Sequence, residues 1–167
     1  MNKAQKKLAD LNLKIERNPN DAWALAHRGE TYRLMERYQE ALQDFDRAIE
    51  LDPEDDWYRY LRALVYLARS QPDLTKADLD TAIQLAQQKY TEKPKNCQNV
   101  FNLALYHLVA GNLPTATEFY QTALQQTASQ SKIQEAIQDL KDLLQVFPQH
   151  PTAQQVIATL EQKLKLH

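Results

Sequence analysis

The chain has 167 residues, of which 43% are hydrophobic and 25% charged, values that are typical of a soluble globular protein of one domain. Its formal net charge of −2 gives no broad attraction to nucleic-acid phosphates or anionic membranes. Two glycines in the whole chain favour helices over sheets, and a single cysteine excludes a disulfide within the chain.

The first predicted element is an amphipathic helix over residues 3–19, a half-repeat that matches only the second helix of the repeat described below. Leu8, Leu11 and Ile15 recur in it at helical spacing. We interpret its basic residues as a solvated helix face: Lys3, Lys6, Lys7, Lys14 and Arg17. The segment lacks the apolar core of a signal peptide, and no run of the chain is apolar enough to span a membrane.

A period of 34 residues organises the next part of the chain, with a first repeat over residues 22–55. A shift by this period aligns Trp23 with Trp57 and Tyr32 with Tyr66. Within the repeat the apolar residues recur at intervals of three, four or seven, which predicts two amphipathic helices. A fixed period of this length is typical of stacked helix pairs.

A third copy follows the second after a shift of 41, which aligns Ala63 with Ala104. The additional seven residues correspond to about two helical turns and are predicted to lengthen the second helix of the second repeat. Pro94 is expected to end that helix. These boundaries give a second repeat over residues 56–96 and a third over residues 97–130.

Acidic residues stand directly before the predicted helices. Asp21 and Asp55 lie where N-caps are expected, because a carboxylate oxygen can accept hydrogen bonds from the free backbone N–H groups. The acidic run around Asp55 lacks the glycine and the ligand spacing of a calcium-binding loop. We therefore interpret it as an inter-repeat turn.

Two further amphipathic helices end the chain, at about Lys132–Val146 and Thr152–Lys165. They belong to a segment over residues 131–167 that we expect to cap the stack, because an uncovered end would expose an apolar face. The prediction is therefore a single all-α domain over residues 1–167 with about nine helices.

Charged residues recur with the same period. Arg28 aligns with Arg62, and both are accompanied by aspartates at equivalent places: Asp44, Asp46, Asp78 and Asp80. We favour an Arg–Asp ladder between paired helices over ligand binding, because bidentate geometry makes such pairs more useful than loose surface pairs.

The segment Ala22–Pro53 closely resembles the tetratricopeptide repeat (TPR). Small residues (Gly29, Ala41 and Ala48), bulky residues (Tyr32 and Phe45) and Pro53 stand at the places that are characteristic of this family. The resemblance is weaker in the second and third copies, and the arginines at 28 and 62 replace residues that are usually apolar. It implies a right-handed superhelical stack of antiparallel helix pairs, a TPR-like α-solenoid.

In this family the first helices of the pairs line a concave groove that holds partner segments. The resemblance therefore implies a binding surface of partly aromatic character, for which packing between neighbouring repeats is the competing interpretation. The candidate residues are Trp23, His27, Glu30, Arg33, Trp57, Tyr60, Leu61, Leu64, Gln98, Phe101, Asn102 and Leu105.

One subclass of the family does not fit the sequence. Members that bind chaperone tails clamp a C-terminal carboxylate with a ring of lysine, arginine and asparagine side chains. At the matching places this chain has Ala26, Glu30, Leu61, Gln98 and Asn102, of which only Asn102 fits. Binding of that type is not expected.

The sequence also gives no reason to expect catalysis, a cofactor or a metal site. His27, His107 and His150 are scattered and form no metal-binding pair at one-turn spacing. Cys97 opens a predicted helix and has no partner residue that suggests a nucleophile.

The predicted function is a non-enzymatic, cytoplasmic protein–protein interaction scaffold that holds an apolar or amphipathic segment of another protein in the groove. Self-assembly is an alternative, with the groove or the terminal helix facing another copy. A helical-repeat RNA binder is a weaker alternative. Such proteins read bases through polar positions on a basic surface, whereas this chain has a net charge of −2.

Overall fold

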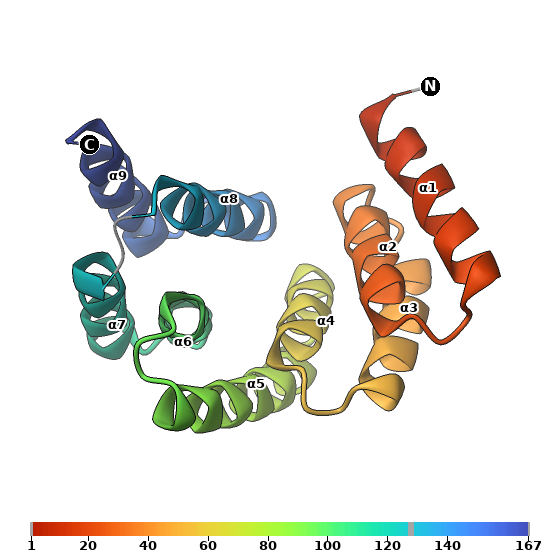
Figure 1. Cartoon of the computed structure of the whole chain (residues 1–167), viewed down its shortest axis with the longest axis horizontal. Helices are drawn as coiled ribbons and strands as arrows, with labels where there is room; N and C mark the ends of the chain where they lie inside the picture. Colours follow the sequence, from red (N-terminus) through yellow and green to blue (C-terminus); the bar gives the residue numbers. More distant parts are fainter. Residues whose placement is uncertain (1, 127–128, 167) are drawn as a thin grey trace. The chain divides into compact units, whose positions relative to one another are not determined.

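The computed structural model of the chain describes residues 2–126 and 129–166. These residues form nine α-helices and no strand, so the predicted all-α fold of antiparallel helix pairs is confirmed (Figure 1). The helices are α1 (Lys3–Arg17), α2 (Ala22–Leu34), α3 (Tyr38–Leu51), α4 (Asp56–Ala68), α5 (Pro72–Glu92), α6 (Cys97–Val109), α7 (Leu113–Gln126), α8 (Gln130–Val146) and α9 (Pro151–Lys165).

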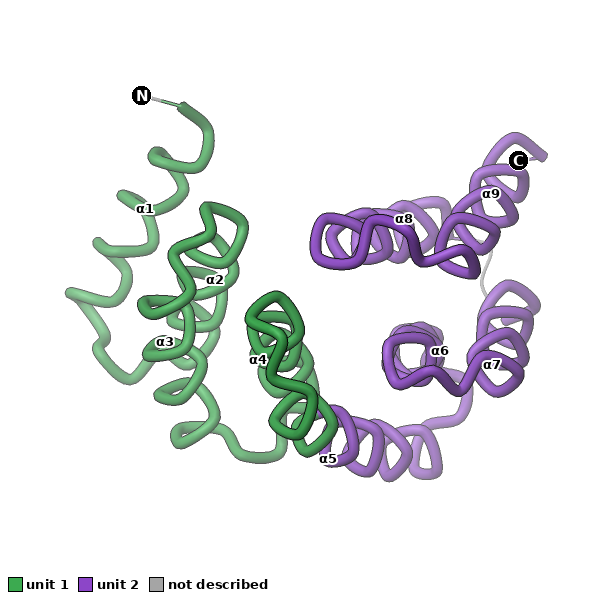
Figure 2. Tube along the Cα trace, turned by 180° about the vertical axis from the view of Figure 1, so that it is seen from behind, with its two compact units in different colours: residues 1–78 green, residues 79–167 purple. Residues whose placement is uncertain are grey.

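The chain divides into two compact units, residues 1–78 and residues 79–167, and the division falls within α5 (Figure 2). In unit 1, α2 pairs with α3, while α1 packs on α2 and α3 packs on α4. In unit 2, α6 pairs with α7 and α8 with α9. The predicted third repeat over 97–130 includes residues 127 and 128, which lie outside the described residues.

The observed helix boundaries follow the predicted signals closely. The first helix ends at Arg17, and the last two begin at Gln130 and Pro151, within two residues of the predicted starts. Helix α5 is 21 residues long, whereas α3 and α7 each have 14. The prediction of a lengthened helix that ends before Pro94 is therefore confirmed.

The predicted N-caps are also confirmed. The Oδ1 atom of Asp21 accepts a hydrogen bond from Ala24 N at 2.9 Å, and that of Asp55 accepts one from Trp57 N at 2.9 Å. Asn96 caps α6 in the same way, through a bond from Gln98 N at 3.0 Å. Each cap satisfies backbone donors that the first helical turn leaves free.

The turn inside each of three helix pairs contains one residue with positive φ. These residues are Glu36 (φ 59°), Ser70 (φ 55°) and Gly111 (φ 84°), and they stand at equivalent places under the shifts of 34 and 41. In each turn a backbone N–H reaches back to a carbonyl five residues earlier, as in Arg37 N to Tyr32 O at 2.9 Å. The left-handed residue thus closes the helix end and fixes the antiparallel pairing.

Close helix approach depends on the small residues that the sequence singled out. A Cβ atom on Gly29 would lie 2.9 Å from Cε1 of Phe45, so only glycine fits between α2 and α3 at this point. Ala41 and Ala48 have no exposed surface. One side of α2 packs against α3 in unit 1. The candidate site residues of α2 lie on the side that faces away from α3.

Candidate functional site

The repeated arginines are structural, as the sequence favoured. Arg28 donates to both carboxylate oxygens of Asp44 at 2.8 and 2.7 Å, and Arg62 does the same to Asp78 at 2.8 and 2.7 Å. Arg62 also donates to Asp46 at 2.7 Å, which joins α3, α4 and α5. Hydrogen bonds to Asp78 outweigh burial and raise the pKa of Arg62. The predicted ladder is therefore confirmed for these pairs.

An exposed tryptophan distinguishes the face of α2 that lies away from α3. Trp23 is 52% exposed, although its ring packs 4.0 Å from the ring of His27, centroid to centroid. The ammonium group of Lys14, on α1, lies 4.7 Å from the Trp23 ring. Leu34, eleven positions after Trp23 on the same helical stripe, is also exposed. Large apolar side chains thus stand at both ends of this stripe.

Between them lies a cluster of charged residues around Glu30. The Oε2 atom of Glu30 lies 3.4 Å from His27 Nδ1 and 3.7 Å from Lys7 Nζ. Burial alone would raise the pKa of Glu30, but the hydrogen bond from His27 and the positive charges of Lys7 and Arg33 outweigh it and lower the pKa. Arg33 is buried, with no hydrogen-bond partner for its Nε and Nη2 atoms among the described residues. The cluster therefore holds more cationic groups than its one carboxylate balances.

On the neighbouring helix α4, Trp57 is partly exposed and its ring lies 4.9 Å from that of Tyr60. Helices α2 and α4 are in contact in unit 1. The two tryptophans that the 34-residue period aligned therefore lie on neighbouring first helices of their pairs.

Other candidate residues lie inside the protein. Each of the following is no more than 3% exposed: Tyr60, Leu61, Leu64, Phe101 and Leu105. In this conformation these side chains pack against the protein itself, as the competing interpretation expects. As a binding site the predicted set stays a prediction, and its members in unit 1 that are at least partly exposed are Trp23, His27, Glu30 and Trp57.

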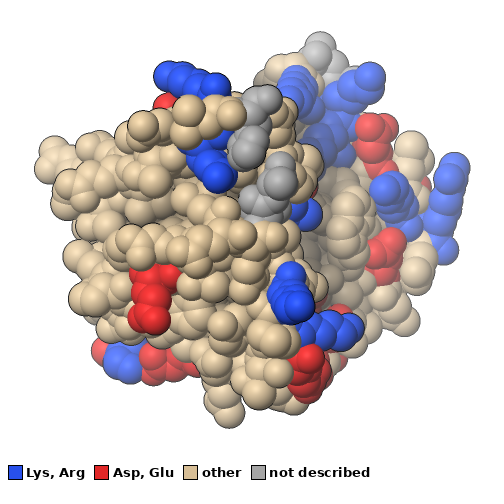
Figure 3. Space-filling view, turned by 60° about the vertical axis from the view of Figure 1, so that its left-hand side comes forward, with Lys and Arg blue, Asp and Glu red and all other residues tan. Residues whose placement is uncertain are grey.

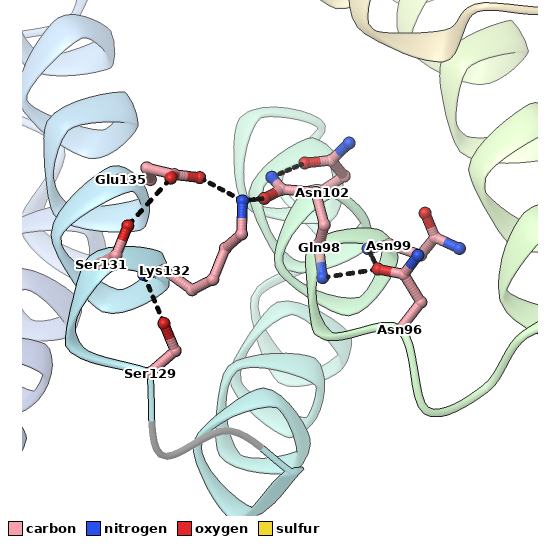
Figure 4. A network of polar contacts seen from close by, with 8 residues as sticks. All are labelled: Asn96, Gln98, Asn99, Asn102, Ser129, Ser131, Lys132 and Glu135. Carbon is pink, nitrogen blue, oxygen red and sulfur yellow. Dashed lines mark hydrogen bonds and ion pairs between the residues drawn. The ribbon is translucent and has the colours of Figure 1, made fainter.

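Two candidate residues of unit 2, Gln98 and Asn102, belong to a polar network between α6 and α8, shown in Figure 4. The amide of Gln98 donates to Asn102 Oδ1 at 3.0 Å, and its Oε1 accepts from Lys132 Nζ at 3.0 Å. Lys132 also pairs with Glu135 at 2.6 Å. Lys132 was not among the predicted site residues, yet it follows Gln98 by 34 positions, so the repeat period carried on into the terminal helices would have found it.

A second surface of unit 2 is almost free of charge. Helix α7 contains one charged residue, Glu118, and the first ten residues of α9 contain none. Figure 3, in which the α7 and α9 side of Figure 1 comes forward, shows a broad surface with few charged side chains. A shallow pocket of about 190 Å³ lies between the two helices, lined by residues that include Tyr120, Leu124 and Val156.

The histidines at 107 and 150 and the single cysteine, which could in principle carry out chemistry, lie in helix caps or packing contacts. His150 is buried and caps α9, where its Nδ1 accepts from Ala153 N at 3.3 Å. His107 stacks on Phe119, and burial lowers its pKa. Cys97 opens α6 as predicted and is partly buried. Within residues 2–126 and 129–166 no group of three or more His, Cys, Asp or Glu side chains could hold a metal ion.

None of the helices in the described part of the chain combines the length and the apolarity that crossing a membrane requires.

The helix pairs, the left-handed turn repeated in three of them and the small residues between paired helices define a helical-repeat protein. Residues 22–55 match the family model of the tetratricopeptide repeat. These are the residues of the first predicted repeat. No curated protein matches the sequence significantly.

Solved structures share the fold. The Cut9–Hcn1 hetero-tetramer of APC/C is 18% identical with a TM-score of 0.54, covering 98% of this chain and 34% of that chain. MamA from Desulfovibrio magneticus RS-1 is 18% identical with a TM-score of 0.51, covering 98% of this chain and 87% of that chain. YrrB, described as a TPR protein with an unusual peptide-binding site, is 19% identical with a TM-score of 0.46, covering 91% and 82%.

Proposed function

We propose that the chain is a non-enzymatic adaptor that holds an apolar or amphipathic segment of another protein against the first helices of its pairs. The TPR fold itself supports a role in protein–protein interaction. One chain of the Cut9–Hcn1 hetero-tetramer is similar to this chain, but the likeness extends to the fold alone. The partner of this chain must therefore be argued from its own residues.

The exposed ring of Trp23 carries the proposal. An indole that is half exposed on a folded monomer leaves a large apolar area in water, and tryptophan is among the residues most enriched at the energetic centres of interfaces. Trp57 on α4 is a second, partly exposed aromatic residue, and Leu34 is a separate exposed apolar residue at the other end of α2. A segment that covers all three would bury aromatic and aliphatic surface together.

The network around Gln98 supports a second contact zone in unit 2. Amide side chains such as those of Gln98 and Asn102 can pair with the backbone N–H and C=O groups of a bound segment. Lys132 adds one cation beside them, since its ammonium group donates to Gln98. The proposal thus names two contact zones, each described within its own unit: an apolar anchor in unit 1 and hydrogen-bonding groups in unit 2.

Affinity capture with purified wild-type and Trp23→Ala proteins tests the proposal, followed by a titration with the purified partner. We expect Trp23→Ala to weaken the partner's affinity by about tenfold or more, since truncating an interface tryptophan typically costs about 2 kcal/mol or more. Phe147→Ala is the matched control, because Phe147 is similarly exposed but lies after α8. Equal affinities for the wild-type and Trp23→Ala proteins would remove α2 from the binding surface.

Trp23→Ala is preferred here to truncation of Phe101. Phe101 is 3% exposed, so its truncation would create a cavity and lower stability together with any binding. Trp23 can be removed with little loss of packing, which keeps the fold intact for the comparison.

Self-assembly is the second candidate function, and the surface between α7 and α9 favours it. Depletion of charged residues distinguishes the centre of interfaces from the rest of a protein surface, and this surface has Glu118 as its one charge in the residues described above. Light scattering over a range of concentrations tests it. A molar mass that stays at 19.4 kDa throughout would exclude this candidate.

A further inference from the structure

The side chain of Arg33 is in an energetically unfavourable position. It is 4% exposed, and its Nε and Nη2 donors have no hydrogen-bond partner within the described residues. Burying a charged group without pairing costs several kcal/mol in general, so such groups are rare unless they serve a purpose. The nearby carboxylate of Glu30 is already in contact with Lys7 and His27.

We propose that Arg33 and Lys7 form a binding site for a side-chain carboxylate of the partner segment, next to the apolar contact at Trp23. This inference rests on the proposed function, because it names the chemistry of the segment that covers α2. The neighbouring Lys7 side chain is 46% exposed, so it stands where an incoming acidic group would arrive first. Arg33 then turns outward to the carboxylate and loses no hydrogen bond in doing so, because its buried donors have none to lose.

Charge complementarity selects an acidic partner. Helix α1, which supplies Lys7 and Lys14 to this face, contains five basic residues and two acidic ones, although the whole chain is slightly acidic. A guanidinium that meets a carboxylate with two parallel hydrogen bonds forms one of the strongest pairs available to a protein. A site of this kind would discriminate glutamate or aspartate from their amides.

The geometry of α2 fixes how the partner's residues must be spaced. Trp23 and Arg33 are ten residues apart, which corresponds to about 15 Å along a helix axis. An extended segment covers that distance with about four or five residues. The expected partner therefore carries an acidic residue and a bulky apolar residue about four or five positions apart.

A protein segment fits this surface better than a membrane or a nucleic acid. Exposed apolar side chains, Trp23 and Leu34, stand at the two ends of the stripe, and the cationic groups lie between them. Anionic membranes and phosphate backbones are bound by broad basic surfaces, whereas the chain as a whole has a net charge of −2.

Two synthetic peptides of about ten residues, blocked at both ends, provide the probe. The first carries a glutamate and a phenylalanine about five positions apart. The second is identical except that glutamine replaces the glutamate. Their binding to the full chain is followed by NMR, through the Trp23 indole N–H and the Arg33 Nε–H signals. We expect the glutamate peptide to bind about tenfold more tightly than the glutamine peptide, with both signals shifting.

The variants Arg33→Met and Lys7→Gln should abolish that preference, while Lys6→Gln, which removes an exposed charge from the same helix, should retain it. Arg33→Met should also raise the melting temperature, because it removes two buried donors that have no hydrogen-bond partner; a lower melting temperature would show a merely structural arginine. The inference is overturned if the two peptides bind wild type equally, if neither binds, or if Lys6→Gln weakens binding as much as Arg33→Met.

Vesicles of phosphatidylserine provide a further arm of the test. Binding to these vesicles that Arg33→Met abolishes would overturn the assignment to a protein segment. The proposed function is judged separately by the loss of partner affinity in Trp23→Ala, so it can hold even where the carboxylate preference fails.

Discussion

The Arg62 ion pairs allow a quantitative prediction about stability. Replacement by methionine keeps most of the side-chain volume but removes two hydrogen bonds to Asp78, whose side chain is 7% exposed, and one to Asp46, whose side chain is 55% exposed. Removing one partner of a buried ion pair lowers the free energy of unfolding by about 3–5 kcal/mol. Because the Arg62 side chain is 19% exposed, we expect Arg62→Met to cost about 3 kcal/mol, the lower end of this range. Urea denaturation followed by circular dichroism measures it.

A double-mutant cycle separates the pair from its parts. Asp78→Leu leaves Arg62 with Asp46 alone and should cost about 2 kcal/mol, since a hydrogen bond to a charged group contributes about 1.5–3 kcal/mol. The double variant should recover much of the loss, because a buried ion pair replaced as a whole by apolar residues is often nearly neutral. Arg47→Met, which removes an exposed pair with Glu50, should cost less than about 0.5 kcal/mol. Additive effects at positions 62 and 78 would refute this reasoning.

Three further predictions follow from the backbone and from the charged cluster. Gly29→Ala should lower the free energy of unfolding by about 1–3 kcal/mol, because the new Cβ would lie 2.9 Å from Phe45; unchanged stability in urea would contradict the packing argument. Ser70→Gly should raise the melting temperature, since relief of a left-handed residue is worth about 1 kcal/mol, and Gly111→Ala should lower it. The lowered pKa of Glu30 adds stability that is fully present above its ordinary value of 4.5 and is lost as the pH falls through the lower pKa of the folded state. The unfolding free energy of Glu30→Gln should therefore depend less on pH in that acidic window than that of the wild type, as denaturation at a series of pH values would show.

The fold was predictable because each repeat packs in the same way, so similar side chains recur at equivalent positions of the sequence. The alignment of Trp23 with Trp57 gave the repeat, and the change of shift from 34 to 41 gave the long helix α5. The Arg62–Asp78 pair was predictable for the same reason, since both members recur with the period. Helix ends followed from capping chemistry, which acts within a few residues of the chain.

The site was less predictable, because periodicity does not tell how much of a side chain the neighbouring helices cover. Trp23 and Tyr60 both lie on first helices, yet Trp23 is 52% exposed and Tyr60 is 1% exposed. The unpartnered state of Arg33 depends on which donors its surroundings satisfy, which sequence spacing cannot show. The interpretation of the terminal helices as caps does not extend the repeat to them, so it does not predict the contact between Lys132 and Gln98.

Hydrogen exchange of the chain with and without its captured partner tests the central claim most directly. Amide exchange reports local opening and covering of each helix. The account predicts that the partner slows exchange in α2 and α4, with a smaller effect in α6, and that Trp23→Ala removes the slowing in α2. Slowed exchange confined to α7 and α9 would contradict it and would place the partner on the surface of unit 2 that is almost free of charge.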